Sequence, residues 1–398
     1  MNLTIFPGKL TGNIQAIASK SQAHRLLICA AFSDKTTELI CSQVNEDIEA
    51  TADCLRAIGT SIARTEDGYR IAPAIHFPQA AVLPCRESGS TLRFMLPIIG
   101  ALGIDTTFQM AGRLPQRPLS PLWAEMERMG CSLTRPDKDT LRCSGQLCPG
   151  TYNIRGDVSS QFVTGLLFAM ALMDGDSQLN ITSPLQSRPY VDMTTSALSA
   201  FGVSANGFTV CGSYPFRSPG TMVVEGDWSN AAFFFAAKEL GNNIEIGNLN
   251  YASAQGDKAV TTLVDELKNH CTISAADIPD LIPILSVVAA ANKGAVFTDV
   301  GRLRIKESNR VDAIMNMLKA FGISSEATES TLTIYPGQFQ GGTVDSVNDH
   351  RIAMSAAIAA TAASEPVTIL NAQCVAKSYP SFWQEYSRLG GNYEQHIR

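Results

Sequence analysis

The sequence has few of the patterns by which metal, redox and nucleotide sites are recognised. Its ten cysteines include no CxxC pair, and its five histidines include no HExxH motif or other clustered ligand spacing. Those spacings mark zinc and redox centres, so we expect no metal site. No GxGxxG or GxxxxGKS segment occurs either. A nucleotide-type phosphate loop is therefore not expected, and we predict a protein that works without a cofactor.

Charged residues and long apolar runs are also scarce. Charged residues make up 17% of the 398 residues, and the net charge of −6 gives no basic surface for nucleic acid. No apolar run approaches the roughly 18 residues that a membrane span needs, and MNLTIFPGKL at the start does not resemble a secretory signal. The apolar content of 45% is ample for two or three domains. We expect a cytoplasmic monomer that binds neither nucleic acid nor membrane.

The densest charge lies in RLRIKESNR, residues 302 to 310, which carries four cations and one anion. Its first three cations alternate with apolar residues, a pattern that predicts a short strand with one polar face. VDAIMNMLKAF follows with helical spacing, so we expect a helix to begin near Glu307 or Ser308. Cations at a helix N-terminus are unfavourable unless an anion lies between them. The stretch therefore indicates an anionic ligand, although a Glu307–Arg310 pair on a solvated helix start is the alternative.

The same helix ending recurs six times along the chain. A helix whose last turn carries a bulky apolar residue closes at a glycine, or once at a cysteine, and extended residues follow. The closing positions are Gly59, Gly130, Gly202, Cys271, Gly322 and Gly390. They are 51 to 72 residues apart, and six copies at nearly constant spacing indicate an internal repeat.

Composition predicts a second helix in each repeat. Six segments are apolar on every side, which is typical of helices buried inside a bundle. They begin at Leu26, Phe94, Phe162, Ala231, Leu281 and Ile352. Short stretches rich in β-branched residues, such as VTIL, lie between the helices. Each repeat thus contains an outer amphipathic helix, an inner apolar helix and several strands, and the fold class is α/β.

The residues just before the apolar helices carry hydroxyls, amides, glycine or cations. These leaders are SKSQAHR (19–25), ESGSTLR (87–93), DVSSQ (157–161), EGDWSN (225–230), DIPD (277–280) and NDHR (348–351). If the repeats direct these helix starts at one space, their N–H groups and dipoles form an anion site. The alternative is that serine and aspartate are ordinary N-caps. That alternative does not account for the cations Lys20, Arg25 and Arg351.

Nine segments together carry a family signature. SKSQAHR, SGSTLR, RLPQRP, DVSSQF, SRPYVD, IPDL, RIKESNR, DHRIAM and AKSYP occur in the order found in EPSP synthases, the 3-phosphoshikimate 1-carboxyvinyltransferases, which the chain resembles from Lys20 to Lys377. The resemblance implies a two-domain enolpyruvyl transferase-like fold with six repeated units, three per domain, and an active site in the interdomain cleft. The implied domains are a discontinuous one, 1–18 plus 228–398, and an inserted one, 19–227.

The resemblance also implies a reaction, the transfer of the enolpyruvyl group of phosphoenolpyruvate to the 5-hydroxyl of shikimate 3-phosphate in aromatic amino-acid biosynthesis. It implies that shikimate 3-phosphate is bound by Lys20, Ser21, Arg25, Ser159, Ser160, Gln161, Ser187, Asp280 and Lys306. It implies that phosphoenolpyruvate is bound by Lys20, Gly89, Arg117, Gln161, Arg310, Arg351 and Lys377. Forked arginine donors suit phosphate and carboxylate, whereas hydroxyls and amides suit a sugar-like ring, so the division is chemically consistent.

For that reaction, two carboxylates and one lysine are the candidate catalytic residues. Asp280 is the expected base, because the dipole of a nearby helix start keeps its carboxylate ionised. The alternative is a helix-capping acid beside Asp277. Glu307 and Lys20 are the candidates for moving the proton at C3 of phosphoenolpyruvate, and the residues alone do not rank them.

The sequence departs from the family pattern at Ala18, Arg86, Glu87, Arg302 and Asn309. These departures affect expected rim contacts and leave the catalytic set intact. Two other functions remain as alternatives. A UDP-N-acetylglucosamine enolpyruvyl transferase typically uses a loop cysteine, but no cysteine occurs between Cys85 and Cys131. A non-catalytic binder of phosphorylated acids is expected to lack a catalytic carboxylate, whereas both candidate carboxylates are present.

Overall fold

The computed structural model describes residues 1–212 and 215–396, and the chain separates into two compact units. Unit 1 comprises Met1–Ile17 and Glu225–Arg398, and unit 2 comprises Ala18–Val224. The chain leaves unit 1 one residue earlier, and returns to it three residues earlier, than the sequence predicted. Each unit has its own hydrophobic core. No helix in the described part of the chain is long and apolar enough to cross a membrane.

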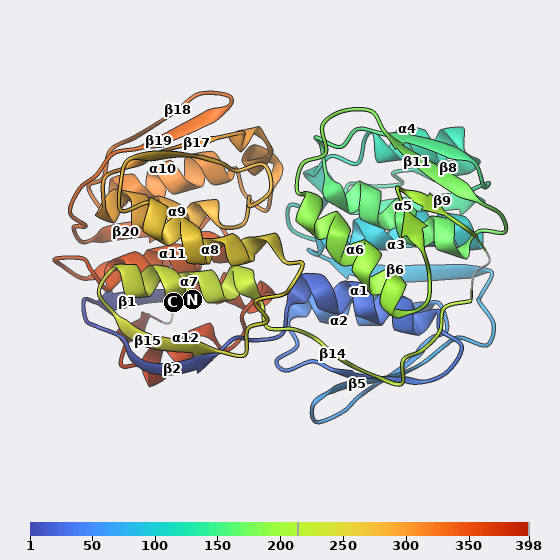
Figure 1. The fold of residues 1–398 in the computed structure, drawn as a ribbon, viewed down its shortest axis with the longest axis horizontal. Coiled ribbons are helices and arrows are strands. Elements are labelled where there is room, and N and C mark those ends of the chain that lie inside the picture. The colour runs from blue at the N-terminus through green and yellow to red at the C-terminus, as the bar shows by residue number, and fades with distance from the viewer. Residues whose placement is uncertain (213–214, 397–398) are drawn as a thin grey trace. The chain divides into compact units, whose positions relative to one another are not determined.

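Six inner helices carry the two cores. They are α1 (Lys20–Ala31), α3 (Gly89–Leu102) and α5 (Ser160–Leu172) in unit 2, and α7 (Trp228–Glu239), α9 (Ile282–Ala291) and α11 (His350–Ala360) in unit 1. Every residue of α11 and nearly every residue of α9 and α5 is buried, which confirms the prediction from their uniform apolarity. Figure 1 shows α7, α9 and α11 side by side within unit 1.

Six outer helices alternate with the inner ones along the chain. They are α2 (Glu46–Ala57), α4 (Leu122–Arg128), α6 (Arg188–Ala200), α8 (Val260–Glu266), α10 (Arg310–Ala320) and α12 (Phe382–Arg388). Short 3-10 helices lie at η1 (Leu114–Gln116), η2 (Gly256–Ala259), η3 (Val300–Ile305) and η4 (Ala372–Lys377). The described residues therefore contain six pairs of one inner and one outer helix, three pairs per unit, as expected for the fold class.

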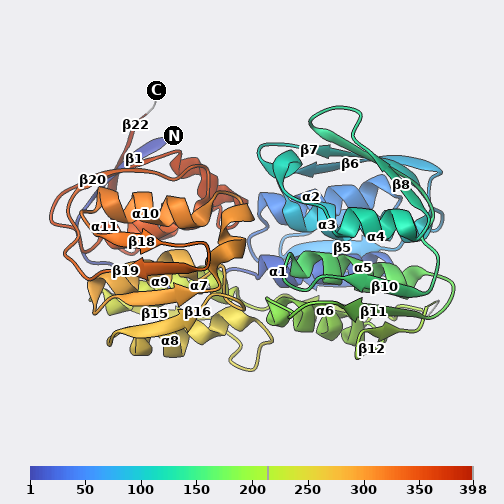
Figure 2. The same ribbon diagram turned by 90° about the horizontal axis from the view of Figure 1, so that it is seen from above.

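Five of the six sheets formed by the described residues share one topology. In each, the first strand is parallel to the second, the third is antiparallel to the second, and the fourth is antiparallel to the third. The first sheet of unit 2 has the strand order β14 (Thr221–Val223), β3 (Thr37–Ile40), β5 (Gly68–Ala72), β4 (Ser61–Arg64). The second has the order β6 (Ala80–Arg86), β7 (Asp105–Met110), β9 (Thr140–Gly145), β8 (Cys131–Thr134). The third has the order β10 (Thr151–Ile154), β11 (Ser177–Ile181), β13 (Thr209–Val210), β12 (Ala205–Asn206). Unit 1 has β16 (Cys271–Ser274), β17 (Ala295–Thr298), β19 (Thr331–Ile334), β18 (Ser325–Ala327), and β20 (Gly342–Asp345), β21 (Val367–Leu370), β1 (Asn2–Phe6), β22 (Asn392–His396). Figure 2 shows β18 and β19 beside α9 and α10.

The sixth sheet has only the parallel pair, β15 (Asn243–Gly247) and β2 (Thr11–Gln15). The five glycine endings have positive φ and precede the fourth strand of a sheet, whereas Cys271 begins β16, the first strand of the next sheet. The repeat that ends at Cys271 therefore lacks the antiparallel hairpin. This missing hairpin explains why the next ending, Gly322, follows after a short interval.

The two chain crossings exchange strands between the units. β2 precedes α1 but pairs in unit 1 with β15, which follows α7. β14 precedes α7 but pairs in unit 2 with β3, which follows α1. The strand just before each crossing, β2 or β14, is thus held in its own unit by a parallel pairing with a strand of another repeat.

Candidate active site

The charged stretch from 302 to 310 forms a 3-10 helix and a turn, so the predicted strand is wrong. η3 covers its first residues, and the backbone then turns before α10. Val300 and Leu303 are buried, whereas Ile305 is 39% exposed. Val300 and Leu303 are thus buried three positions apart, a spacing that fits a 3-10 helix and not the alternation of a strand.

Arg310 is the centre of a buried charge cluster in unit 1. It is the first residue of α10, which begins two to three residues later than the sequence predicted, and its side chain is 1% exposed. Nε donates to Oδ2 of Asp349 at 2.9 Å, Nη1 to Oδ1 of Asp280 at 2.7 Å, and Nη2 to Oε2 of Glu307 at 2.8 Å. All three guanidinium nitrogens bond to carboxylates, and this fixes the orientation of the planar head.

Arg351, on α11, reaches the same carboxylate of Asp280. Its Nη2 donates to Oδ2 of Asp280 at 2.9 Å and to Oγ of Ser229 at 3.0 Å, and its Nη1 donates to the backbone oxygen of Asp280 at 3.2 Å. Asp280 lies two residues before α9, near the helix start that the sequence predicted. Ser229 is on α7, so the N-terminal ends of the three inner helices of unit 1 meet around these side chains.

Burial and charge set the protonation of the cluster in opposite directions. Burial alone raises the pKa of Asp280, but Arg351, Lys306 and Arg310 outweigh it and hold this pKa well below its usual range. Burial lowers the pKa of Lys306 to about 8, against the opposing effect of Asp280, whose Oδ1 is 3.8 Å from Nζ. Asp280 is therefore ionised at neutral pH, whereas Lys306 loses its proton as the pH rises through about 8.

Lys377 lies at the end of η4, and its Nζ donates to the backbone oxygen of Asn348 at 3.1 Å. Asn348 belongs to the leader of α11, which also carries Asp349 and Arg351. Lys377 is thus attached to the same helix start as Arg351. The structure therefore brings together the predicted site residues of unit 1, which are Asp280, Lys306, Glu307, Arg310, Arg351 and Lys377.

In unit 2, Lys20 is the first residue of α1, and Ser19 caps the helix. Nζ of Lys20 donates to Oδ2 of Asp47 at 2.9 Å, and the two side chains are 15% and 17% exposed. Oγ1 of Thr91, on α3, donates to the backbone oxygen of Asp47 at 3.4 Å. Asp47, in the first turn of α2, therefore links the N-terminal ends of α1 and α3.

Arg25 is buried, with 2% exposure. Its nitrogens donate to the backbone oxygens of Ser21 and Tyr190 and to the hydroxyls of Thr164 and Thr194. Burial lowers the pKa of Arg25 to about 10. These acceptors lie on α1, α5 and α6, so the guanidinium fastens three helices together.

Gly89, Arg117 and Gln161 are brought together by Arg93. A Cβ added to Gly89 meets Nη1 of Arg117 and lies 2.7 Å from Nη1 of Arg93. Arg93 donates to Oε1 of Gln161 at 3.2 Å and to the backbone oxygen of Pro118 at 3.0 Å. A side chain at Gly89 therefore displaces the two arginine heads.

Three of the four predicted serines lie at two further helix starts. The side chain of Ser159 caps α5 by accepting from the backbone N–H of Gln161 at 3.3 Å, and Ser160 is the first residue of that helix. Ser187 precedes α6 in the left-handed region, with φ of +55°, and is 1% exposed. A serine is uncommon in this conformation, and such backbone is often found at functional sites.

Sequence reasoning missed three residues that hold these groups. They are Asp349, which bonds Arg310, Ser229, which bonds Arg351, and Asp47, which bonds Lys20. Asp349 and Ser229 stand in two of the helix leaders, so their position was a signal for them. Asp47 is near the start of an outer helix among other acids, and nothing in its local pattern distinguishes it.

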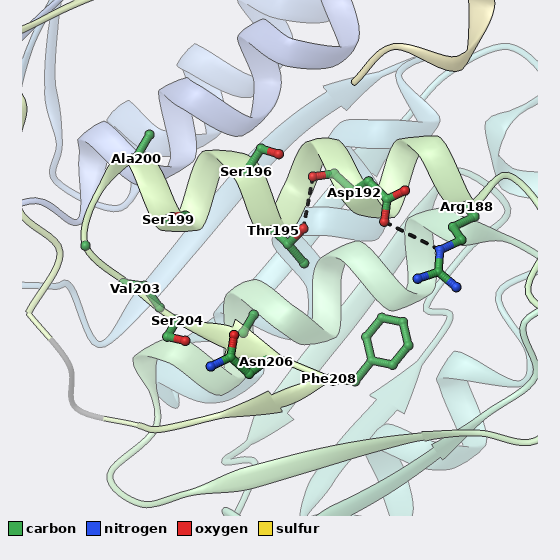
Figure 3. A pocket seen from close by; sticks show the side chains of 13 residues that line it. Arg188, Asp192, Thr195, Ser196, Ser199, Ala200, Val203, Ser204, Asn206 and Phe208 are labelled. Atoms are coloured by element: carbon green, nitrogen blue, oxygen red, sulfur yellow. Dashed lines mark hydrogen bonds and ion pairs between the residues drawn. The ribbon is translucent and has the colours of Figure 1, made fainter. Parts of the chain in front are cut away.

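A polar groove of about 840 Å³ also lies outside these groups, along α6 and the turn after it. Figure 3 shows Arg188 and Asp192 directed toward each other beside the ring of Phe208. A similar groove of about 600 Å³ lies between the end of α10 and Tyr335. Both occur where an outer helix passes through a glycine into the fourth strand of a sheet. They are consequences of the repeat, and neither contains the chemistry of a catalytic site.

Comparison with known proteins identifies the family of the chain. The family model for EPSP synthase (3-phosphoshikimate 1-carboxyvinyltransferase) matches residues 6–277 and 262–386. The chain is 36% identical over 419 residues to the 3-phosphoshikimate 1-carboxyvinyltransferase of Clostridium kluyveri, which covers 99% of this chain and 98% of the relative. It is 36% identical over 430 residues to that of Clostridium beijerinckii, with the same coverage.

Solved structures show the same fold. An EPSP synthase from Acinetobacter baumannii superposes with a TM-score of 0.81 at 24% identity and covers 99% of this chain and 100% of its own. The enolpyruvyl transferase NikO from Streptomyces tendae gives a TM-score of 0.81 at 17% identity and covers 100% of this chain and 99% of its own. Because the curated relatives align over nearly their whole length, the chain belongs to the EPSP synthase family, the 3-phosphoshikimate 1-carboxyvinyltransferases.

Proposed function

We propose that the residues of this family member divide the work of its reaction between two sets, one in each unit. The reaction transfers the enolpyruvyl group of phosphoenolpyruvate to the 5-hydroxyl of shikimate 3-phosphate and releases phosphate. The observation that carries the assignment is the bridging of two buried arginines by Asp280. It places a candidate base directly beside donors suited to a carboxylate.

The proposed contacts of shikimate 3-phosphate are Lys20, Ser21, Arg25, Ser159, Ser160, Gln161, Ser187, Asp280 and Lys306. The serine hydroxyls at the starts of α5 and α6 support this set, since helix N-termini attract phosphate. Arg25 already donates to four protein groups, so we propose that it also holds Ser21 and the α6 start around the ligand, in addition to its proposed contact.

The proposed contacts of phosphoenolpyruvate are Lys20, Gly89, Arg117, Gln161, Arg310, Arg351 and Lys377. Arg310 and Arg351 bind its carboxylate, because their Nη groups already hold a carboxylate in this geometry. Arg117 and Lys20 bind its phosphate. The absence of a side chain at Gly89 leaves room for the guanidinium of Arg117.

The chemistry proceeds by addition and elimination. The 5-hydroxyl oxygen attacks C2 of phosphoenolpyruvate while Asp280 takes the hydroxyl proton and C3 gains a proton. Loss of a proton from C3 and departure of phosphate then restore the double bond. Lys306 orients the hydroxyl. Glu307, bonded to Arg310, and Lys20, bonded to Asp47, are the two candidates for the proton at C3.

A phosphate-release assay tests the proposed function. Purified protein is mixed with phosphoenolpyruvate and shikimate 3-phosphate, and we expect phosphate to appear only when both are present. A binding protein releases none. An enzyme specific for UDP-N-acetylglucosamine releases phosphate only when that sugar nucleotide replaces shikimate 3-phosphate.

We also propose that the protein works as a monomer in the cytoplasm. A protein with two cores of its own and an active site built from one chain does not need a partner to complete it. Light scattering during size-exclusion chromatography tests this, and we expect the mass of one 42.7 kDa chain. A dimer mass contradicts the monomer proposal, and recovery of the protein in a membrane fraction contradicts the cytoplasmic one.

A further inference from the structure

Three carboxylates surround Arg310, and they differ in their access to solvent. Asp349 is fully buried, whereas the side chains of Asp280 and Glu307 are 19% and 27% exposed. Asp280 also reaches Arg351, which is 3% exposed. The accessible side of the arginine pair is therefore occupied by a carboxylate of the chain itself.

A carboxylate that bridges two arginines has the same chemistry as a carboxylate ligand. One oxygen of Asp280 accepts from Nη1 of Arg310 at 2.7 Å, and the other accepts from Nη2 of Arg351 at 2.9 Å. These are the groups that the proposed function assigns to the carboxylate of phosphoenolpyruvate. Two ionised carboxylates on the same two Nη groups would repel each other strongly. Nη1 of Arg310 and Nη2 of Arg351 therefore hold one carboxylate between them at a time.

We propose that Asp280 is the resident carboxylate of the Arg310–Arg351 pair and that the carboxylate of phosphoenolpyruvate displaces it. The displaced side chain then becomes the base that takes the proton of the 5-hydroxyl. Binding of one substrate therefore prepares the group that activates the other. The inference rests on the proposed function and adds a coupling between the two substrates.

The charges around Asp280 give this displacement a chemical consequence. The charged groups that act on it are Lys306 before α10, Arg310 on α10 and Arg351 on α11, and the carboxylates of Glu307 and Asp349 bond to Arg310. While the cations hold its pKa well below the usual range, the carboxylate is a weak base. Movement away from the two arginines raises the pKa toward its ordinary value, and the carboxylate becomes a stronger base.

Chemical rescue of Asp280→Ala by formate tests the displacement without any substrate. The variant leaves two buried arginines short of a carboxylate, so its melting temperature is expected to fall. Formate is small enough to take the place of the missing group. We expect it to raise the melting temperature of Asp280→Ala saturably and by more than that of wild type, with chloride at equal ionic strength as the reference.

Calorimetric titration of phosphoenolpyruvate into Asp280→Asn provides the second measurement and covers the case in which the alanine variant fails to fold. The neutral amide competes less well for the arginines. We expect a roughly tenfold lower Kd than in wild type, because a resident carboxylate no longer limits access to the competent state. Turnover of the variant falls by orders of magnitude, since the amide is not a base.

Asp277→Ala is the matched control, because it removes an exposed acid from the same segment. It is expected to behave as wild type in both measurements. Equal formate responses in wild type and Asp280→Ala, or a Kd for phosphoenolpyruvate that is unchanged or higher in Asp280→Asn, overturn the displacement. The proposed function fails separately, if wild type releases no phosphate from the two substrates.

Discussion

At the scale of single residues, we expect Lys306 to make substrate binding sensitive to pH. Burial lowers its pKa to about 8 from the ordinary 10.5, amid the charges of Asp280, Arg302, Arg310 and Glu307. We expect affinity for shikimate 3-phosphate to fall as pH rises through about 8, because the neutral amine no longer attracts a phosphorylated acid. Lys306→Arg is expected to move this fall to higher pH in a calorimetric titration series.

The stability of the folded state changes in the opposite sense. The unfolded lysine keeps its proton up to about 10.5, so the folded state binds fewer protons between pH 8 and 10.5. Stability relative to Lys306→Met is therefore expected to rise with pH in that window. Lys319→Arg, an exposed change on α10, is the control that leaves both profiles unmoved. An affinity profile that is flat between pH 7 and 9 in wild type contradicts the assignment of Lys306.

Gly89 is the second residue whose substitution has a specific outcome. A methyl group there displaces the heads of Arg117 and Arg93. If the phosphonate glyphosate competes for this site, Gly89→Ala is expected to weaken its inhibition more than it raises the KM for phosphoenolpyruvate, since glyphosate is the longer anion. Stability is expected to change by less than about 1 kcal/mol, because alanine is the better helix former and the position has no strained backbone.

Inhibition curves and KM values in wild type and Gly89→Ala provide the measurement. Gly8→Ala is a matched control, because a Cβ at Gly8 meets no atom within 4 Å. If both values stay at wild-type levels in Gly89→Ala, the arginine heads near Gly89 do not contact the ligand, and the assignment of this helix start to phosphoenolpyruvate has to be withdrawn.

At the scale of elements, Asp349 joins α10 to α11. One carboxylate oxygen caps α11 by accepting from the backbone N–H of Arg351, and the other accepts from Arg310 and from the hydroxyl of Ser308. Asp349→Ala is expected to cost about 3–5 kcal/mol of unfolding free energy, because it removes a fully buried carboxylate and leaves Nε of the buried Arg310 without its acceptor. Asp349→Asn keeps the cap and is expected to cost less.

Denaturant unfolding of these variants tests the junction between the two helices. Asp312→Ala removes an acid of α10 that is 60% exposed and paired at the surface with Arg304, so a loss below about 1 kcal/mol is expected. A loss in Asp349→Ala no larger than in Asp312→Ala shows that the junction does not hold the two helix starts together.

At the scale of the whole molecule, the proposed ligand groups are divided between the units. Lys20, Arg117 and Gln161 lie in unit 2, and Arg310 and Arg351 lie in unit 1. Neither unit has a complete set of the proposed contacts, so the proposal requires groups of both units for binding. We expect small-angle scattering to show a smaller radius of gyration when both substrates are added, since bound anions relieve the repulsion between the two cation sets. A radius of gyration that stays constant contradicts this closure.

The sequence by itself determined the repeat architecture and the chemistry. The glycine endings, the uniformly apolar helices and the polar leaders depend on local rules of capping and periodicity, which need no knowledge of distant contacts. The family motifs are also short local stretches that can be read without the tertiary structure. They identified the fold and the reaction, and the family comparison confirms both.

Only the tertiary structure decided which groups touch. Residues 302 to 306 alternate as a strand does, but the burial of Val300 and Leu303 three positions apart makes the segment a 3-10 helix. Likewise, Asp280 attracts both Arg310 and Arg351, which are 30 and 71 residues away in the chain. Such long-range pairs depend on how the inner helices pack, and they decide whether a carboxylate is a free base or a partner of two arginines.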